Sequence, residues 1–86
     1  MKKFFYAPNI SWQLLDNEII IVNEKNKKVY LLQNTAKDFW LAIDGKNIDD
    51  IVSSLYREYS AEYQQLEKDL KEFYENLKNL DLIEEI

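Results

Sequence analysis

Hydrophobic and polar residues alternate along the first third of the chain, and this period predicts β-strands. Residues 10–14 alternate strictly, residues 18–23 are rich in β-branched side chains, and residues 28–33 are predicted to form a third strand. Short polar stretches separate the three segments, at residues 16–17 and 24–27. Three strands joined by short polar turns predict an antiparallel meander.

The period then changes to that of helices. Thr35 and Asp38 match a capping box, in which each side chain bonds a backbone N–H at the start of a helix. Gly45, the one glycine of the chain, stands where the C-cap of that first helix would need a positive φ. Asn47 opens a second helix that carries two acidic residues in its first turn.

A third helix is predicted over about residues 61–80, with Ser60 as its cap. Its apolar residues recur at intervals of four and three, which predicts a buried stripe made of Leu66, Leu70, Phe73, Leu77 and Leu80. A second stripe, half apolar and half charged, suits either a solvated flank or the wall of a peptide-binding groove: Glu67, Leu70, Lys71, Tyr74 and Lys78. The order of three strands and then three helices predicts one α+β domain over residues 1–86.

Charge disfavours some partners. The 86 residues carry a net charge of −5, and the acidic residues are concentrated in the second half. An acidic chain repels phosphate, which counts against nucleic acid as a partner. The one basic cluster, Lys25, Lys27 and Lys28, is interpreted as a solvated hairpin tip. Apolar runs such as residues 19–22 are far too short to cross a membrane, and no signal peptide is visible, so we expect a cytoplasmic protein.

The residues that usually carry chemistry are scarce. The chain has no Cys and no His, so its Ser and Thr residues have no histidine to act as a base. Asp49 and Asp50 are adjacent, and adjacent residues of a helix face different directions, which favours a solvated helix start over a catalytic pair. One glycine is too few for a glycine-rich phosphate loop. We therefore expect no catalytic residue, no metal site and no cofactor.

The third predicted strand is the last of the meander, so one of its sides is expected to be a free edge. Its residues Val29, Tyr30, Leu31 and Leu32 are all apolar, so both of its faces need a cover. Two interpretations remain open at this point. The long third helix covers the second face, or a groove remains between strand and helix and accepts a peptide strand.

Several ordered motifs resemble the PqqD family, the leader-recognition domains (RiPP recognition elements) of ribosomally made and modified peptides. They are the Leu-x-Asn-Thr-Ala of residues 32–36, the aromatic pair Phe39-Trp40, the Asp-Gly-Lys of residues 44–46 and the closing Leu82-Ile83. The resemblance covers about residues 8–83. The chain departs from the family at Asp81, where glycine is usual, and at residues 33–34, where the usual step is Asn followed by an acid.

The resemblance implies a winged-helix-like fold, in which a precursor peptide's leader adds as a strand to the third strand and packs against the third helix. It implies a second partner, a modifying enzyme such as a radical-SAM protein, a leader protease or a cyclase, and it leaves homodimer formation open. The expected peptide-binding residues are Lys28, Val29, Tyr30, Leu31, Leu32, Glu67, Leu70, Lys71, Tyr74 and Lys78. A winged-helix nucleic-acid-binding protein is the alternative function, and a small enzyme is disfavoured because no catalytic arrangement is present.

Overall fold

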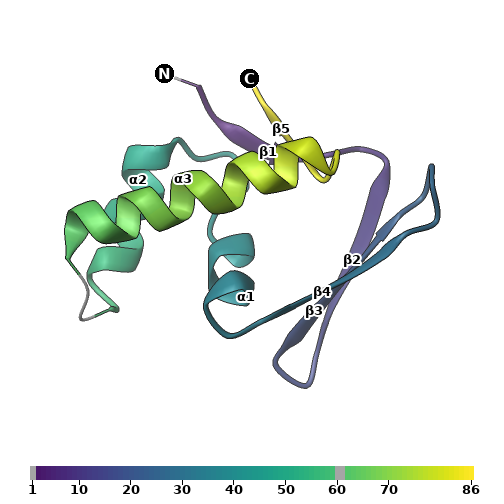
Figure 1. Ribbon diagram of the computed structural model, residues 1–86, viewed down its shortest axis with the longest axis horizontal. Coiled ribbons are helices and arrows are strands. Elements are labelled where there is room, and N and C mark those ends of the chain that lie inside the picture. Colours follow the sequence, from purple (N-terminus) through teal and green to yellow (C-terminus); the bar gives the residue numbers. More distant parts are fainter. Residues whose placement is uncertain (1, 60–61) are drawn as a thin grey trace.

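A computed structural model describes residues 2–59 and 62–86 (Figure 1). The chain forms two small antiparallel sheets and three helices in the order β1, β2, β3, β4, α1, α2, α3, β5. Their bounds are β1 Phe4–Tyr6, β2 Ile10–Leu15, β3 Glu18–Asn23, β4 Val29–Gln33, α1 Asn34–Leu41, α2 Ile48–Tyr56, α3 Tyr63–Asn79 and β5 Ile83–Glu85. The α+β class and the order of a three-stranded sheet before three helices are confirmed.

Strands β2, β3 and β4 form the predicted meander, in that spatial order. Asp16 and Asn17 connect β2 to β3, and both have a positive φ (51° and 65°), as the commonest two-residue hairpin turn requires. One face of the sheet carries the aligned row Trp12, Ile21 and Tyr30, which belongs to the core or packs against it. The other face points away from the helices. It carries the rows Ser11, Val22, Val29 and Gln13, Ile20, Leu31.

A second sheet pairs the two ends of the described chain and was not predicted. Strand β1 runs antiparallel to β5, with Phe5 opposite Glu84 (Figure 1). In β5, Ile83 is buried and pairs with Tyr6. A three-residue strand has too few residues to show a period, and its partner is almost the whole chain away.

The helix ends agree only in part with the predicted caps. Asn47 caps α2 as expected, because its side chain accepts a hydrogen bond from the backbone N–H of Asp50 at 2.9 Å. The capping box at Thr35 is wrong: α1 begins at Asn34, its N-cap is Gln33, two residues before Thr35, and the Gln33 side chain makes no capping hydrogen bond. Gly45 has the expected positive φ of 75°, but it lies beyond the end of α1 and donates its N–H to the carbonyl of Phe4 instead. The predicted cap Ser60 lies outside the described residues.

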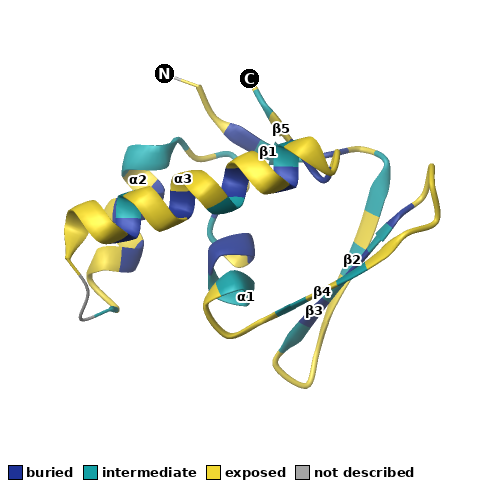
Figure 2. Cartoon of the chain, viewed as in Figure 1, coloured by how far each residue is buried: buried dark blue, intermediate teal, exposed yellow. Residues whose placement is uncertain are grey.

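The core lies where the three helices meet, with the inner face of the three-stranded sheet against α1 (Figure 2). Trp40 is fully buried and stacks on Tyr6, with ring centroids 4.5 Å apart. On α3 the buried residues are Leu66, Leu70, Tyr74 and Leu77, so the predicted stripe is rotated: Phe73 is half-buried and Leu80 is exposed. Within residues 2–59 and 62–86, no helix has the length and apolar character needed to cross a membrane.

Candidate peptide-binding edge

Strand β4 is an edge strand: among the described residues it pairs on one side only, with β3. The hydrogen bonds of the adjoining turn determine which of its backbone groups are free. Asn23 donates its N–H to the carbonyl of Lys28 at 2.9 Å, which places these two residues opposite each other at a hydrogen-bonding position of the ladder. Such pairs alternate along an antiparallel ladder, so Tyr30 and Leu32 bond β3. The N–H and C=O groups of Val29, Leu31 and Gln33 therefore point outward at the free edge.

The side chains of β4 divide between the two faces of the sheet. Tyr30 and Leu32 are half-buried and pack against the core. Val29 and Leu31 lie on the opposite face and are 64% and 54% exposed. The interpretation that the third helix covers this second face is wrong. Helix α1 packs on the inner face of the sheet, and α3 lies on the same side of the sheet, farther away than α1. The strand thus combines an unpaired backbone edge with two exposed apolar side chains.

Two residues predicted to line the groove belong to the core. Leu70 is fully buried, and Tyr74 is 1% exposed. The Tyr74 hydroxyl donates a hydrogen bond to the carbonyl of Phe39 at 3.0 Å, and burial raises the pKa of this phenol far above its usual value. The expectation that Tyr74 lies outside the core is therefore wrong.

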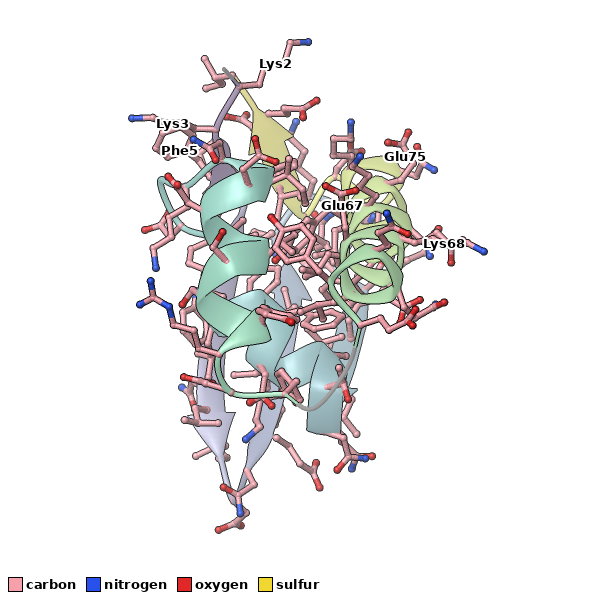
Figure 3. All side chains as sticks on the ribbon, turned by 90° about the vertical axis from the view of Figure 1, so that its left-hand side faces the viewer. Lys2, Lys3, Phe5, Glu67, Lys68 and Glu75 are labelled. Atoms are coloured by element: carbon pink, nitrogen blue, oxygen red, sulfur yellow. The ribbon has the colours of Figure 1, made fainter. Side chains whose placement is uncertain are left out.

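The predicted charged residues of α3 lie on the flank that faces away from β4. We call this the Lys71 flank: Glu67, Lys71, Glu75 and Lys78. Figure 3 shows Glu67 and Glu75 on the side of α3 nearer to the β1–β5 pair, with the three-stranded sheet at the opposite end of the view. Lys71 and Lys78 border a hollow of about 280 Å³ that is also lined by Phe4 of β1 and Glu85 of β5.

One ion pair joins this flank to β5, and two others lie within α3. Lys78 lies 3.1 Å from a carboxylate oxygen of Glu75 and 3.2 Å from one of Glu85, and these two hydrogen bonds raise the pKa of its ammonium group. Lys71 lies 3.8 Å from Glu67 on the same helix. The lysines are thus neutralised locally, at a site that β4 does not line.

The opposite flank of α3 was not predicted as a binding surface. We call it the Phe73 flank: Asp69, Phe73, Asn76 and Leu80. Phe73 and Lys71 are two residues apart, which places them about 200° apart around the helix axis. Phe73 packs edge-to-face on Phe39 of α1, the helix that also packs against β4, with ring centroids 5.6 Å apart. The Phe73 ring is half-buried and Leu80 is 39% exposed. These two side chains make the flank partly apolar, although Asp69 and Asn76 on the same flank are polar.

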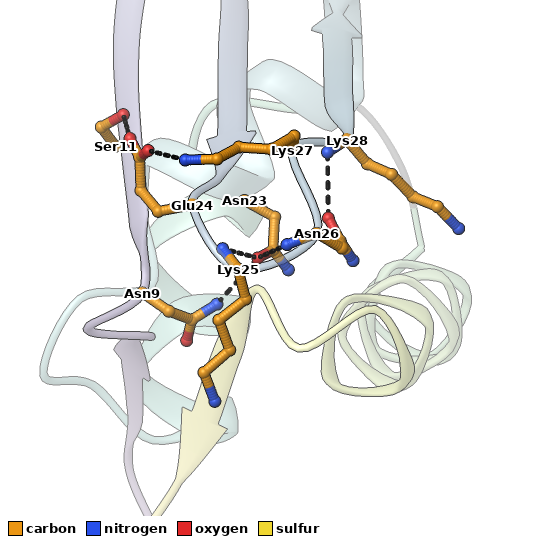
Figure 4. A network of polar contacts seen from close by, with 8 residues as sticks. All are labelled: Asn9, Ser11, Asn23, Glu24, Lys25, Asn26, Lys27 and Lys28. Carbon is orange, nitrogen blue, oxygen red and sulfur yellow. Dashed lines mark hydrogen bonds and ion pairs between the residues drawn. The ribbon is translucent and has the colours of Figure 1, made fainter.

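The basic cluster at the hairpin tip does not form one patch. Figure 4 shows the three lysine side chains extending in different directions. Lys27 pairs with Glu24 at 3.6 Å, and Lys25 lines a hollow with Asp81 and Glu84. Lys28 stands directly before β4 and is exposed. This arrangement agrees with a solvated tip and does not form a phosphate site.

Groups suited to acid–base or metal chemistry do not converge in the part of the chain that the structure describes. No group of three or more acidic residues there is placed to hold a metal ion. Burial raises the pKa of the Tyr6 phenol to about 12, and its hydroxyl donates to the carbonyl of Trp40 at 2.7 Å. Burial and a hydrogen bond to Asp38 raise the pKa of Tyr59 to about 12 as well. Both phenols are therefore protonated donors at neutral pH.

Comparison with known proteins agrees with this architecture. The family model described as coenzyme PQQ synthesis protein D (PqqD) matches residues 18–83, from β3 into β5. The chain belongs to the PqqD family. The Asp81 departure from the family pattern is accommodated: Asp81 adopts the left-handed conformation, with φ 59°, that glycine would take more easily.

Two solved structures share the fold of this PqqD-family chain. One is described as TbiB1 in complex with the TbiA(beta) leader peptide; it has a TM-score of 0.87 and 23% identity, and covers 93% of this chain and 94% of its own. The other is a lasso peptide synthetase B1 complexed with the leader peptide; it has a TM-score of 0.85 and 23% identity, and covers 95% and 98%. No protein among the curated sequences compared with the chain is a match.

Proposed function

We propose that this PqqD-family chain binds the leader segment of a ribosomally made precursor peptide by adding it as a strand to β4. The observation that carries the proposal is the outward direction of the backbone groups of Val29, Leu31 and Gln33, because an unpaired edge accepts an extended peptide through main-chain hydrogen bonds. The fold shared with two leader-peptide complexes supports the proposal.

The side chains proposed to contact the leader differ from the predicted set. A strand added to β4 places alternate side chains on the inner side of the sheet, beside Tyr30 and Leu32, and toward the Phe73 flank of α3. Of the predicted residues, Lys28, Val29, Tyr30, Leu31 and Leu32 remain in the proposed site. Leu70 and Tyr74 support it from the core, and Glu67, Lys71 and Lys78 lie on the far flank.

The proposed role is tethering and not catalysis. A bound leader would hold the rest of the precursor at a high effective concentration near a modifying enzyme, such as a radical-SAM protein, a leader protease or a cyclase. We propose that this occurs in the cytoplasm, where the precursor is translated. Nucleic-acid binding is disfavoured by the net charge of −5 and by the separation of the three hairpin lysines.

A peptide titration followed by NMR tests the proposal. The probe is a synthetic leader peptide, taken from the N-terminal half of a candidate precursor sought among the genes neighbouring this one. Binding should protect the amides of Leu31 and Gln33 from hydrogen exchange, whereas the amides of Tyr30 and Leu32 are already bonded to β3 and should change little. Tight binding with unchanged exchange along β4, or with protection confined to β2, would contradict strand addition at this edge.

A pair of α3 variants tests which flank faces the leader. Leu80→Ala shortens an exposed side chain of the Phe73 flank, and Lys71→Ala shortens an exposed one of the Lys71 flank. Neither residue is in the core, so both variants should fold. We expect Leu80→Ala to weaken binding about tenfold, as the loss of an interface side chain does, and Lys71→Ala to bind like the wild type. The reverse result would restore the originally predicted wall.

A further inference from the structure

A buried asparagine collects several hydrogen-bond donors at the end of β3. Asn23 is 1% exposed, and its Oδ1 accepts from the backbone N–H of Lys25 at 2.9 Å and of Asn26 at 3.4 Å. The same oxygen accepts from Nδ2 of Asn9 at 3.3 Å (Figure 4). A buried amide oxygen must be satisfied in this way, so its donors are held close to it.

Asn9 extends this network to the end of α3. Its Nδ2 carries two hydrogens and also lies 3.3 Å from the carbonyl oxygen of Asp81, in the turn between α3 and β5. That turn is itself well defined: Asp81 and Leu82 donate their N–H groups to the carbonyls of Lys78 and Leu77, each at 3.0 Å. We call the set of Asn9, Asn23 and the Asp81 carbonyl the asparagine bracket. It joins the β3–β4 turn (residues 24–28) to the C-terminal end of α3.

The bracket lies at the end of the sheet where β4 begins. Further along, β3 and β4 are held to the helices by α1, which follows β4 directly. The beginning of β4 is the part farthest along the strand from α1. A link between the β3–β4 turn and the end of α3 therefore fixes the strand at a second point, near Lys28 and Leu80.

We propose that Asn9 is a positioning residue: through the bracket it sets the orientation of the β4 edge relative to the C-terminal half of α3. The expected effect on peptide binding rests on the proposed function. If a leader binds between the β4 edge and α3, their relative orientation fixes the space available to it. A site held in its binding geometry before the peptide arrives loses less freedom on binding. Asn9 need not contact the peptide to influence its affinity.

The first test uses the free protein and needs no ligand. Residual dipolar couplings measure the orientation of the β3–β4 hairpin relative to α3 in the wild type and in two variants. Asn9→Ala removes both links of the bracket. Asn26→Ala is the matched control, because it removes one hydrogen bond within the turn, from the N–H of Lys28 to Oδ1 of Asn26 at 2.9 Å, and leaves the bracket intact. The inference requires that Asn9→Ala, and not Asn26→Ala, changes the orientation of the hairpin relative to α3 or broadens its range of orientations. An unchanged orientation in Asn9→Ala would overturn the inference.

The second test measures the affinity for the synthetic precursor peptide by fluorescence polarisation, together with the melting temperature. We expect Asn9→Ala to weaken binding about fivefold, the equivalent of one ordinary hydrogen bond, and Asn26→Ala to leave affinity unchanged. Equal loss of affinity in both variants would show a general effect of turn stability and would refute a positioning role. If the wild type binds no peptide while Asn9→Ala still disperses the hairpin, the proposed function fails and the bracket's structural role stands.

Discussion

The free edge of β4 can be tested by a proline substitution that removes one outward N–H. Leu31→Pro deletes a donor that no β3 residue uses, because the hydrogen-bonded pairs of the ladder are at Tyr30 and Leu32. Proline is tolerated on an edge strand when its missing N–H would face solvent. The Leu31 side chain is 54% exposed, so little burial is lost, and we expect stability to fall by no more than about 1 kcal/mol.

The expected effect on leader binding is larger. Removing this N–H leaves the leader's carbonyl without a partner at the interface, which costs about 1–3 kcal/mol. A loss of about 1–3 kcal/mol corresponds to a roughly 5- to 150-fold lower affinity. Isothermal titration with the precursor peptide measures the affinity, and circular dichroism measures the melting temperature of the same samples.

Leu14→Pro on the other edge strand is the matched control. Glu24 donates its N–H to the carbonyl of Asn9, which places the β2–β3 bonded pairs at Ser11, Gln13 and Leu15, so the Leu14 N–H also points outward. Its side chain is 50% exposed, close to that of Leu31. Leu14→Pro should keep wild-type affinity. A folded Leu31→Pro protein that binds as tightly as the wild type, or a Leu14→Pro protein that loses affinity instead, would refute strand addition at β4.

Three further outcomes follow from the structure. Tyr74→Ala should destabilise the fold by about 3–5 kcal/mol, because the side chain is only 1% exposed. Tyr74→Phe should cost only about 1–2 kcal/mol, for the lost hydrogen bond to Phe39. Equal melting temperatures for the two variants would contradict a core role. Asp81→Gly should stabilise the protein by about 1 kcal/mol, because glycine adopts a φ of 59° without strain. A lower melting temperature of this variant would contradict the expected relief of backbone strain. Leader affinity should fall only modestly between 50 and 200 mM salt, because backbone bonds and apolar contacts dominate the proposed site, and a loss of about a thousandfold would indicate a polyelectrolyte partner.

Local periodicity was sufficient for the meander and for the existence of the three helices. It was not sufficient for the orientation of α3, where Phe73 and Tyr74 stand three and four residues after Leu70 and fit an apolar stripe equally well. The tyrosine is the buried one because its hydroxyl reaches the carbonyl of Phe39, in a helix more than thirty residues earlier. No pattern within α3 shows that partner, so Tyr74 was predicted on an exposed flank although it belongs to the core.

Long-range pairing was also invisible in the sequence. Strand β1 finds its partner in β5, and Gly45 serves that arrangement through its bond to Phe4 instead of capping a helix. Both features depend on contacts between segments that are distant along the chain. The asparagine bracket is similar, since Asn9, Asn23 and Asp81 resemble ordinary turn residues until the fold brings them together.

The proposed site at β4 is visible in the sequence as an apolar edge strand that would favour aggregation. An edge strand with apolar residues on both faces invites association, and proteins usually shorten or charge such edges. Here β4 is only five residues long and Lys28 precedes it, yet Val29 and Leu31 stay exposed where polar residues would be safer. A sequence that keeps such a liability is expected to use it. The same two residues carry outward backbone groups, so pattern and hydrogen-bond register lead independently to one surface for a peptide strand.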